Sequence, residues 1–378
     1  RSEWDKDLLD LFCEESLHLG DYVSSLAPEG KISVYGHAGY QNLPGADCVN
    51  KMSMRNVPGA KGGDRLFGIF DRAVKARNIP VLVNCPARRL VRRGNEVLGV
   101  EAVYEGNPYF VKANKAVVIC TGGFQSNPEL MARYIYGNPM AYLGSPAHTG
   151  DGLLMAREIG AQIVGNDSAI AQILPFGAAM QDLFTYAGLF VSLDGQRFMD
   201  ESLPRPARTP VVLAQTGQPK YFILLDAARA TENVQAAVDA GTAYSGASLE
   251  ELAAAAGMDP EKLTQTVQRY NELCAAGNDE DFNKNADLMQ PVEEGPYYAV
   301  LCTMNTSGTF AGPLTTMDAE VVNEQNQVIP GLYAAGEVSS GDLFYKEYPG
   351  SGTAIQSFIT MGRIAGQQAA QYALEKTK

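Results

Sequence analysis

The residues best suited to chemistry lie in a short stretch near the C-terminus. Glu337 follows the apolar run 328–336, which predicts a strand that ends at small residues and one carboxylate. Tyr348 then opens the glycine-rich sequence Tyr-Pro-Gly-Ser-Gly, and a helical pattern follows over 354–374. A strand-end carboxylate can accept hydrogen bonds from sugar hydroxyls, and free amides at a helix start favour electron-rich oxygens. The stretch is therefore suited to a dinucleotide.

Glycines in the same stretch let a ligand approach the backbone closely. The expected cofactor contacts are Gly336, Glu337, Thr353, Ala354 and Ile355. The alternative is a strand-to-helix turn with a purely structural role, because a fold alone does not imply a site.

A family resemblance rests on these motifs. Gly-Leu-Tyr-Ala-Ala-Gly-Glu-Val at 331–338, and Gly-Arg-Ile-Ala-Gly at 362–366, resemble the C-terminal FAD-binding segment of the fumarate reductase/succinate dehydrogenase flavoprotein superfamily. That group includes soluble fumarate and urocanate reductases, 3-ketosteroid dehydrogenases and tricarballylate dehydrogenases. The resemblance implies FAD as the cofactor.

Motifs upstream extend the resemblance. A strand, a small meander and the apolar run 116–120 lead into Thr-Gly-Gly at 121–123. In the superfamily this order closes the FAD domain around the adenosine end of the cofactor. The resemblance implies a backbone contact from Ala87 to adenine, and a close approach of Thr121 and Gly122 to the cofactor.

A further match is Thr-Gly-Asp-Gly at 149–152. It resembles the family motif whose aspartate, here Asp151, touches FAD. Alternatively, Thr149 or Asp151 caps the helix expected at 153–159, and the two roles are compatible.

One arginine matches the family's proton donor. In fumarate reductases this donor lies four residues after the glutamate of a Gly-x-Arg-Phe-x-x-Glu motif, and here that glutamate is Glu201 and the arginine is Arg205. Such a residue exchanges a proton with the carbon beside the one that exchanges a hydride. Pro204 and Pro206 flank it, so the alternative is a surface arginine in a proline-rich loop.

The remaining fumarate-binding groups of the family have no counterpart. Residues 172–175 read Gln-Ile-Leu-Pro, residues 307–309 read Ser-Gly-Thr, and residues 347–352 read Glu-Tyr-Pro-Gly-Ser-Gly. Without those cationic groups a C4 dicarboxylate would be poorly neutralised. The sequence therefore disfavours fumarate as the substrate.

Tyr-Pro-Gly-x-Gly instead resembles the 3-ketosteroid dehydrogenases. The resemblance implies that the Tyr348 hydroxyl and the Gly352 amide bind a ring carbonyl and stabilise the enolate formed beside it. The surrounding residues also resemble tricarballylate dehydrogenases, so the motif leaves the substrate open. Alternatively, Tyr348 is a core aromatic residue whose hydroxyl meets a backbone carbonyl.

Composition excludes several classes of function. The 378 residues are 46% hydrophobic and 19% charged, as in a soluble globular protein. A net charge of −13 argues against a nucleic-acid surface, because phosphate binding needs clustered Lys and Arg. No apolar run approaches the roughly 18 to 20 residues of a membrane span. The six scattered cysteines are expected to be buried free thiols, and the three histidines show no metal-binding pattern.

The expected fold is α/β, with an FAD-binding Rossmann-like domain and an inserted α+β capping domain. The predicted segments are 1–126 for the first part of the FAD domain, 127–291 for the capping domain, and 292–378 for the second part. A strand, Gly-x-Gly-x-x-Gly turn and helix that would hold the pyrophosphate are absent from the sequence. We expect this N-terminal βαβ unit to be missing or supplied by another chain, with weak FAD binding without it.

Several elements are predicted in the first part. They are a helix over 1–25, a loop over 36–58, a helix over 64–77, a strand over 80–84 and a buried strand over 116–120.

The function expected is an FAD-dependent oxidoreductase that forms or reduces a C=C bond beside a carbonyl of a small molecule. The alternatives are an enoate or polycarboxylate reductase and a non-catalytic subunit without flavin. The electron donor or acceptor, the oligomeric state and the compartment stay open.

Overall fold

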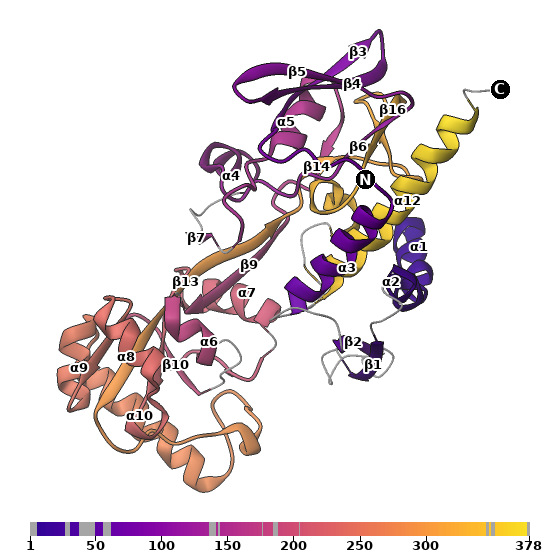
Figure 1. The fold of residues 1–378 in the computed structure, drawn as a ribbon. Helices are drawn as coiled ribbons and strands as arrows, with labels where there is room; N and C mark the ends of the chain where they lie inside the picture. Colours follow the sequence, from indigo (N-terminus) through magenta and orange to yellow (C-terminus); the bar gives the residue numbers. More distant parts are fainter. Residues whose placement is uncertain are drawn as a thin grey trace. The chain divides into compact units, whose positions relative to one another are not determined.

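The structure is a computed structural model, and two compact units make up the chain (Figure 1). The residues described are 6–26, 31–37, 50–55, 62–135, 141–142, 144–175, 177–183, 188–203, 205–344, 348 and 352–375. Unit 1 comprises residues 1–137, 144–170 and 308–378, and unit 2 comprises residues 138–143 and 171–307.

Unit 1 combines helices with small sheets. Its helices are α1 (Lys6–Ser16), α2 (Leu19–Leu26), α3 (Gly62–Ala76), α4 (Pro128–Tyr134), α5 (Asp151–Glu158), α11 (Gly341–Phe344) and α12 (Thr353–Glu375). Its strands are β1 (Lys31–His37), β2 (Asn50–Arg55), β3 (Ala87–Arg93), β4 (Glu96–Tyr104), β5 (Asn107–Lys112), β6 (Val117–Ile119), β8 (Ile163–Val164), β14 (Gly312–Pro313), β15 (Glu320–Val322) and β16 (Val328–Ala334). The sheets follow the orders β15-β16-β6, β3-β4-β5, β1-β2 and β14-β8.

Strand β16 organises unit 1 because both of its faces are buried. Leu332 and Ala334 point into one hydrophobic cluster, whereas Tyr333 and Ala335 point into another that includes Ala354 of α12. This alternation follows from the period of two in a strand. β6 runs parallel to β16, so both strands end at the same edge of the sheet.

Unit 2 is built around one larger sheet. Its strands follow the order β10-β11-β13-β12, and β7 and β9 also pair with β13. The strands are β7 (Ala141–Tyr142), β9 (Ala169–Pro175), β10 (Leu189–Val191), β11 (Lys220–Leu225), β12 (Ala243–Gly246) and β13 (Tyr297–Thr309). The helices are α6 (Met180–Leu183), α7 (Arg205–Thr216), α8 (Glu232–Asp239), α9 (Leu249–Ala256) and α10 (Pro260–Ala276).

The central strand β11 is also buried on both faces. Tyr221, Ile223 and Leu225 face one core cluster, and Phe222 and Leu224 face the other. Because hydrophobic clusters cover both faces of the β11 sheet, unit 2 has a core of its own, as expected for a compact folding unit.

Several predicted elements agree with the structure, and others were wrong. The helix at 64–77 and the small meander before the apolar run 116–120 are confirmed. The helix predicted over 1–25 is two helices with a turn at 17–18, and residues 1–5 lie outside the described residues. The loop predicted over 36–58 contains strand β2, which pairs antiparallel with β1.

The strand predicted at 80–84 is not formed, and its apolar side chains are exposed. Val81 and Val83 are 68% and 70% exposed, and Ile79 is 52% exposed. A strand needs a hydrogen-bonded neighbour, and no described strand pairs with this segment.

The buried strand predicted at 116–120 is only partly buried. β6 lies at an edge of its three-stranded sheet, with Val118 37% exposed. Cys13 and Cys120 are also exposed, contrary to the expectation of buried thiols, whereas Cys302 is buried as expected. Cys48 lies outside the described residues.

Candidate functional site

The turn after β6 presents polar and glycine backbone groups. Gly122 has φ +71°, in the left-handed region that favours glycine. The Thr121 hydroxyl is buried and has no hydrogen-bond partner among the described residues. A side chain at Gly123 would come within 2.3 Å of Glu337 Oε1 and 2.4 Å of Thr309 Oγ1. The turn therefore packs directly against Glu337.

Glu337 follows the end of β16 and is 8% exposed. The Thr309 amide donates to its Oε1 at 3.0 Å. Burial raises the pKa of Glu337, and the Thr309 hydrogen bond and the nearby His148 oppose that rise. The preceding Gly336 has φ +86°, and the space around its Cα is open.

Three side chains join the turn to Glu337. Thr309 Oγ1 accepts from the Phe124 amide at 2.8 Å and donates to Gln125 Oε1 at 3.2 Å. Gln125 Nε2 lies 2.7 Å from His148 Nδ1. His148 Nδ1 lies 3.8 Å from Glu337 Oε2. These contacts join β13, the β6 turn and the segment before α5.

Asp151 is the first residue of α5. Its Oδ1 accepts from the Thr149 hydroxyl at 2.9 Å. The residue that caps α5 is Gly150, with φ +81° and no side-chain hydrogen bond, so the predicted cap by Thr149 or Asp151 was wrong. A side chain at Gly152 would meet Thr121 Oγ1 at 2.2 Å, so α5 begins against the β6 turn.

Tyr348 lies five residues before the start of α12. Its hydroxyl accepts from the Ala354 amide at 3.2 Å. Its ring packs near Phe310 and Phe344, with centroids 6.2 Å and 5.7 Å away. The core packing foreseen for Tyr348 is thus present, although its hydroxyl meets an amide rather than a carbonyl. Residues 349–351 lie outside the described residues.

The remaining residues at the start of α12 differ in burial. Ala354 is buried and Ile355 is 53% exposed. Gly352 is exposed, has φ +96°, and has open space around its Cα. Thr353 is the first residue of α12. This helix start therefore leaves room for a ligand beside Gly352.

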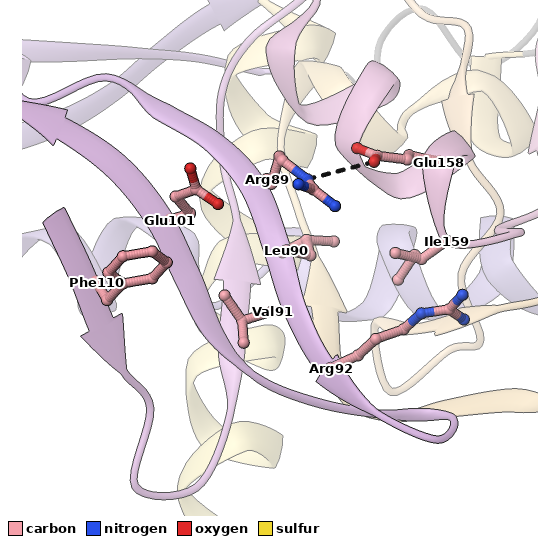
Figure 2. Close-up of a pocket in the computed structure, with 8 residues that line it drawn as sticks. All are labelled: Arg89, Leu90, Val91, Arg92, Glu101, Phe110, Glu158 and Ile159. Carbon is pink, nitrogen blue, oxygen red and sulfur yellow. Dashed lines mark ion pairs between the residues drawn. The ribbon is translucent and has the colours of Figure 1, made fainter. Parts of the chain in front are cut away.

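Ala87 begins β3 and pairs with Ala102 of β4. Farther along the same strand, a pocket of about 340 Å³ opens between the meander and α5 (Figure 2). Figure 2 shows Arg89 directed towards Glu158, at 3.4 Å between Nε and Oε1. The pocket contains none of the predicted site residues, and its two arginines are balanced by two glutamates.

Arg205 begins α7 in unit 2, and its side chain lies outside what the structure describes. Glu201, four residues earlier, is fully buried. Its carboxylate accepts from Arg197 at 2.9 Å and from Lys284 at 3.0 Å. The glutamate of the motif thus fixes the turn that leads to Arg205.

All of the predicted cofactor residues lie in unit 1, whereas Arg205 belongs to unit 2. Sequence reasoning missed Thr309, Gln125 and His148 as partners of this site. His148 directly precedes the Thr-Gly-Asp-Gly motif and Gln125 closely follows Thr-Gly-Gly, so their positions beside two motifs were an available signal. Thr309 had no local signal, because its partners are far away in the sequence.

Among the described residues, no group of three or more His, Cys, Asp and Glu side chains could hold a metal ion. No helix in the described part of the chain is long and apolar enough to cross a membrane.

Comparison with known proteins decides the family. Residues 34–355 match the family described as FAD binding domain. The chain belongs to this family. Its relatives place it in the fumarate reductase/succinate dehydrogenase flavoprotein superfamily, as the motifs predicted, and FAD is the cofactor of that group.

Two curated relatives and one solved structure illustrate the similarity. Fumarate reductase (cytochrome) from Shewanella frigidimarina is 35% identical over 87% of this chain and 58% of its own length. The 3-oxosteroid 1-dehydrogenase of Mycolicibacterium smegmatis is 26% identical over 87% of this chain and 65% of its own length. The open conformation of a flavocytochrome c3 fumarate reductase has a TM-score of 0.76 at 29% identity, over 99% of this chain and 65% of its own.

The chain therefore spans less than two thirds of the length of these proteins. The fold is that of the FAD-binding flavoproteins, with mixed helices and sheets.

The residues of unit 1 that were predicted to contact FAD fit such a cofactor. The buried Thr121 hydroxyl has no described partner, and Gly336 and Gly352 leave open space at two turns. Such groups suit a ligand that carries many hydroxyl and phosphate oxygens.

Proposed function

We propose that the chain is the larger part of an FAD-dependent oxidoreductase that adds or removes hydrogen at a carbon–carbon bond beside a carbonyl. The observation that carries the proposal is the Tyr348 hydroxyl, which accepts from the Ala354 amide at the start of α12. Accepting from that amide uses only a lone pair of the hydroxyl oxygen, and the hydroxyl proton stays available to a substrate carbonyl. Gly352 beside it is exposed, with open space around its Cα.

In this proposal, each group has one task. Tyr348 and the Gly352 amide hold the carbonyl oxygen and stabilise the negative charge that develops there. Arg205, or a tyrosine of the capping domain, exchanges the proton at the neighbouring carbon. When bound, FAD supplies the two-electron chemistry of the reaction.

The cofactor would be held by residues of unit 1. The proposed contacts are Ala87, Thr121, Gly122, Asp151, Gly336, Glu337, Thr353, Ala354 and Ile355. The substrate-binding capping domain would run from about residue 127 to about residue 291 and so contain most of unit 2.

A further strand-containing unit would complete the cofactor site. β6 is an edge strand, and Val118 and Cys120 beside that edge are exposed. We propose that a βαβ unit, in the same polypeptide or another, adds a parallel strand at this edge and supplies the pyrophosphate turn. Adding that unit should increase FAD affinity and protect the Cys120 thiol from alkylation; unchanged affinity and alkylation would contradict it.

The experiment begins with FAD reconstitution and a visible absorption spectrum. Flavin bands retained after gel filtration support the cofactor assignment, whereas their absence, with the βαβ unit also present, would favour a non-catalytic scaffold. Steady-state assays with 3-ketosteroids and with acrylates then separate the substrate classes. Turnover of ketosteroids alone is the expected result.

A second candidate, an enoate or polycarboxylate reductase, is supported by the 35% identity to a fumarate reductase. In that case Arg205 and other arginines would bind the carboxylate. Turnover of acrylates but not ketosteroids would favour this candidate. With either substrate, Tyr348→Phe should lower turnover strongly and leave flavin bound if Tyr348 holds the carbonyl.

A further inference from the structure

His148 lies where the expected cofactor approaches the β6 turn. Its imidazole rests on Gly122, since a Cβ at that glycine would come within 2.8 Å of both Cδ2 and Nε2 of the ring. The His148 side chain is 28% exposed, so part of the ring is open to a ligand.

A chain of hydrogen bonds fixes which nitrogen of His148 carries the proton. The Phe124 amide can only donate, so Thr309 Oγ1 accepts from it at 2.8 Å. The Thr309 hydroxyl then uses its own proton towards Gln125 Oε1 at 3.2 Å. With Oε1 as the acceptor, the other end of the Gln125 amide is its NH₂ group, which only donates.

That NH₂ group faces His148 Nδ1 at 2.7 Å. Nδ1 must therefore be an acceptor without a proton. The competing partner, Glu337 Oε2, is 3.8 Å from Nδ1, which is too far for a hydrogen bond. The neutral imidazole consequently carries its proton on Nε2.

The Nε2 proton is available to a ligand. None of the described residues accepts a hydrogen bond from His148 Nε2, and Nε2 is the ring nitrogen that lies against Gly122. The same turn contains the Thr121 hydroxyl, which also has no partner among the described residues.

We infer that His148 is a cofactor-contacting residue, held by Gln125 in the Nε2–H form so that it donates a hydrogen bond to an oxygen of FAD. The inference rests on the proposed flavin function. It assigns Gln125 and Thr309 as positioning residues, because they set the proton position without touching the cofactor themselves.

The first test measures the tautomer in the protein without FAD. Two-bond ¹H–¹⁵N spectra of histidine-labelled protein distinguish Nδ1–H from Nε2–H, and the signals that vanish in His148→Gln belong to His148. We expect Nε2–H in the wild type. In Gln125→Glu a carboxylate, which only accepts, replaces the donor, so Nδ1 should become protonated. An Nδ1–H wild type, or an unchanged Gln125→Glu spectrum, would overturn the inference.

The second test titrates FAD into a matched pair of variants. The His148→Gln variant keeps an N–H donor near the position of Nε2, whereas His148→Asn is too short to reach it. FAD affinity should stay within about twofold in the first and fall roughly five- to tenfold in the second, the loss expected for one hydrogen bond. The exposed His18 provides a control, because His18→Asn should leave the affinity unchanged.

The two proposals fail differently. If the wild type binds FAD and His148→Asn binds it equally well, the contact from His148 is wrong and the proposed function stands. If the wild type binds no FAD with the βαβ unit present, the proposed function is wrong, and the contact with it.

Discussion

At the scale of single residues, Gly123 shows how tightly the candidate site is built. An added methyl group would lie 2.3 Å from Glu337 Oε1, 2.4 Å from Thr309 Oγ1 and 2.6 Å from Gln125 Oε1. Three polar side chains would have to move, and their hydrogen bonds would weaken.

We therefore predict that Gly123→Ala lowers the free energy of unfolding by about 1 to 3 kcal/mol. The exposed Gly366 in the interior of helix α12 has open space around it and makes a matched control. There the same substitution should stabilise by about 0.5 to 1 kcal/mol, because alanine favours the helix. Urea unfolding of both variants measures the difference, and equal effects would contradict the packing described.

Glu337 gives a prediction about pH. Burial raises its pKa in the folded protein above the ordinary value of 4.5. A raised folded pKa means that the folded state binds the proton more tightly, so this stabilisation is present below pH 4.5 and is lost as the pH rises through the folded pKa. Glu337→Gln should therefore raise the free energy of unfolding of the FAD-free protein at pH 7. This increase over the wild type should become smaller towards pH 4. Unfolding curves across this range check it, and a pH-independent gain would be evidence against it.

Tyr348 has a structural role that its proposed chemistry does not require. Tyr348→Phe removes the acceptor of the Ala354 amide at the start of α12. We expect a loss of about 1 kcal/mol in the free energy of unfolding. The substitution should lower stability even when neither substrate nor FAD is present. Chemical denaturation of the protein without flavin therefore separates this effect from the effect on turnover.

At the scale of elements, a buried ion cluster ties the segment after α10 to the turn after β10. Arg197 Nη2 lies 2.7 Å from Asp279 Oδ2, and the Lys284 ammonium group reaches Glu201 at 3.0 Å. Burial acts to raise the pKa of Asp279, but the hydrogen bonds and charge of Arg197, together with hydrogen bonds from the Lys284 and Phe282 amides, outweigh it and hold the pKa at about 2.

Removing one member of this cluster should be costly. Asp279→Ala removes one of the two carboxylates that balance the buried charge of Arg197. We expect the free energy of unfolding to fall by about 3 kcal/mol. Because the folded pKa of Asp279 is depressed, its contribution is present above pH 3.8 and disappears as the pH falls towards about 2. The destabilisation by Asp279→Ala should thus narrow in strong acid, as measured by thermal unfolding. An equal penalty at pH 2 and pH 7 would exclude the ionic explanation.

Elements with local signals could be predicted from the sequence. The helix α10 follows from Asp259, Pro260 and its apolar spacing, and Asp259 does accept from two amides of the first turn. By contrast, the contact of Thr309 with Gln125 joins residues 184 positions apart, so no local sequence pattern near either residue predicts it. The strand predicted at 80–84 failed for the related reason that strand formation depends on a partner.

At the scale of the whole molecule, the two units have separate cores. The clusters around β16 belong to unit 1, and those around β11 belong to unit 2. The proposed cofactor residues all come from unit 1.

Binding of FAD should therefore stabilise the units unequally. We predict slower amide hydrogen exchange in the turns at 121–126 and 148–152 and at the start of α12, because a ligand stabilises the region that it contacts. Strand β11 and helix α10 should show little change. Hydrogen-exchange mass spectrometry with and without FAD makes the comparison, and equal protection in both units would contradict a cofactor site built by unit 1.

The exposed segment from Ile79 to Val83 has a practical consequence for handling the protein. Its apolar side chains, and the edge of β6 that pairs with no described strand, are features through which chains associate edge to edge. The 378-residue chain, purified without any added partner, should form oligomers as the protein concentration rises. Light scattering should detect these oligomers. A charged residue such as Lys in place of Val81 should keep the preparation monodisperse.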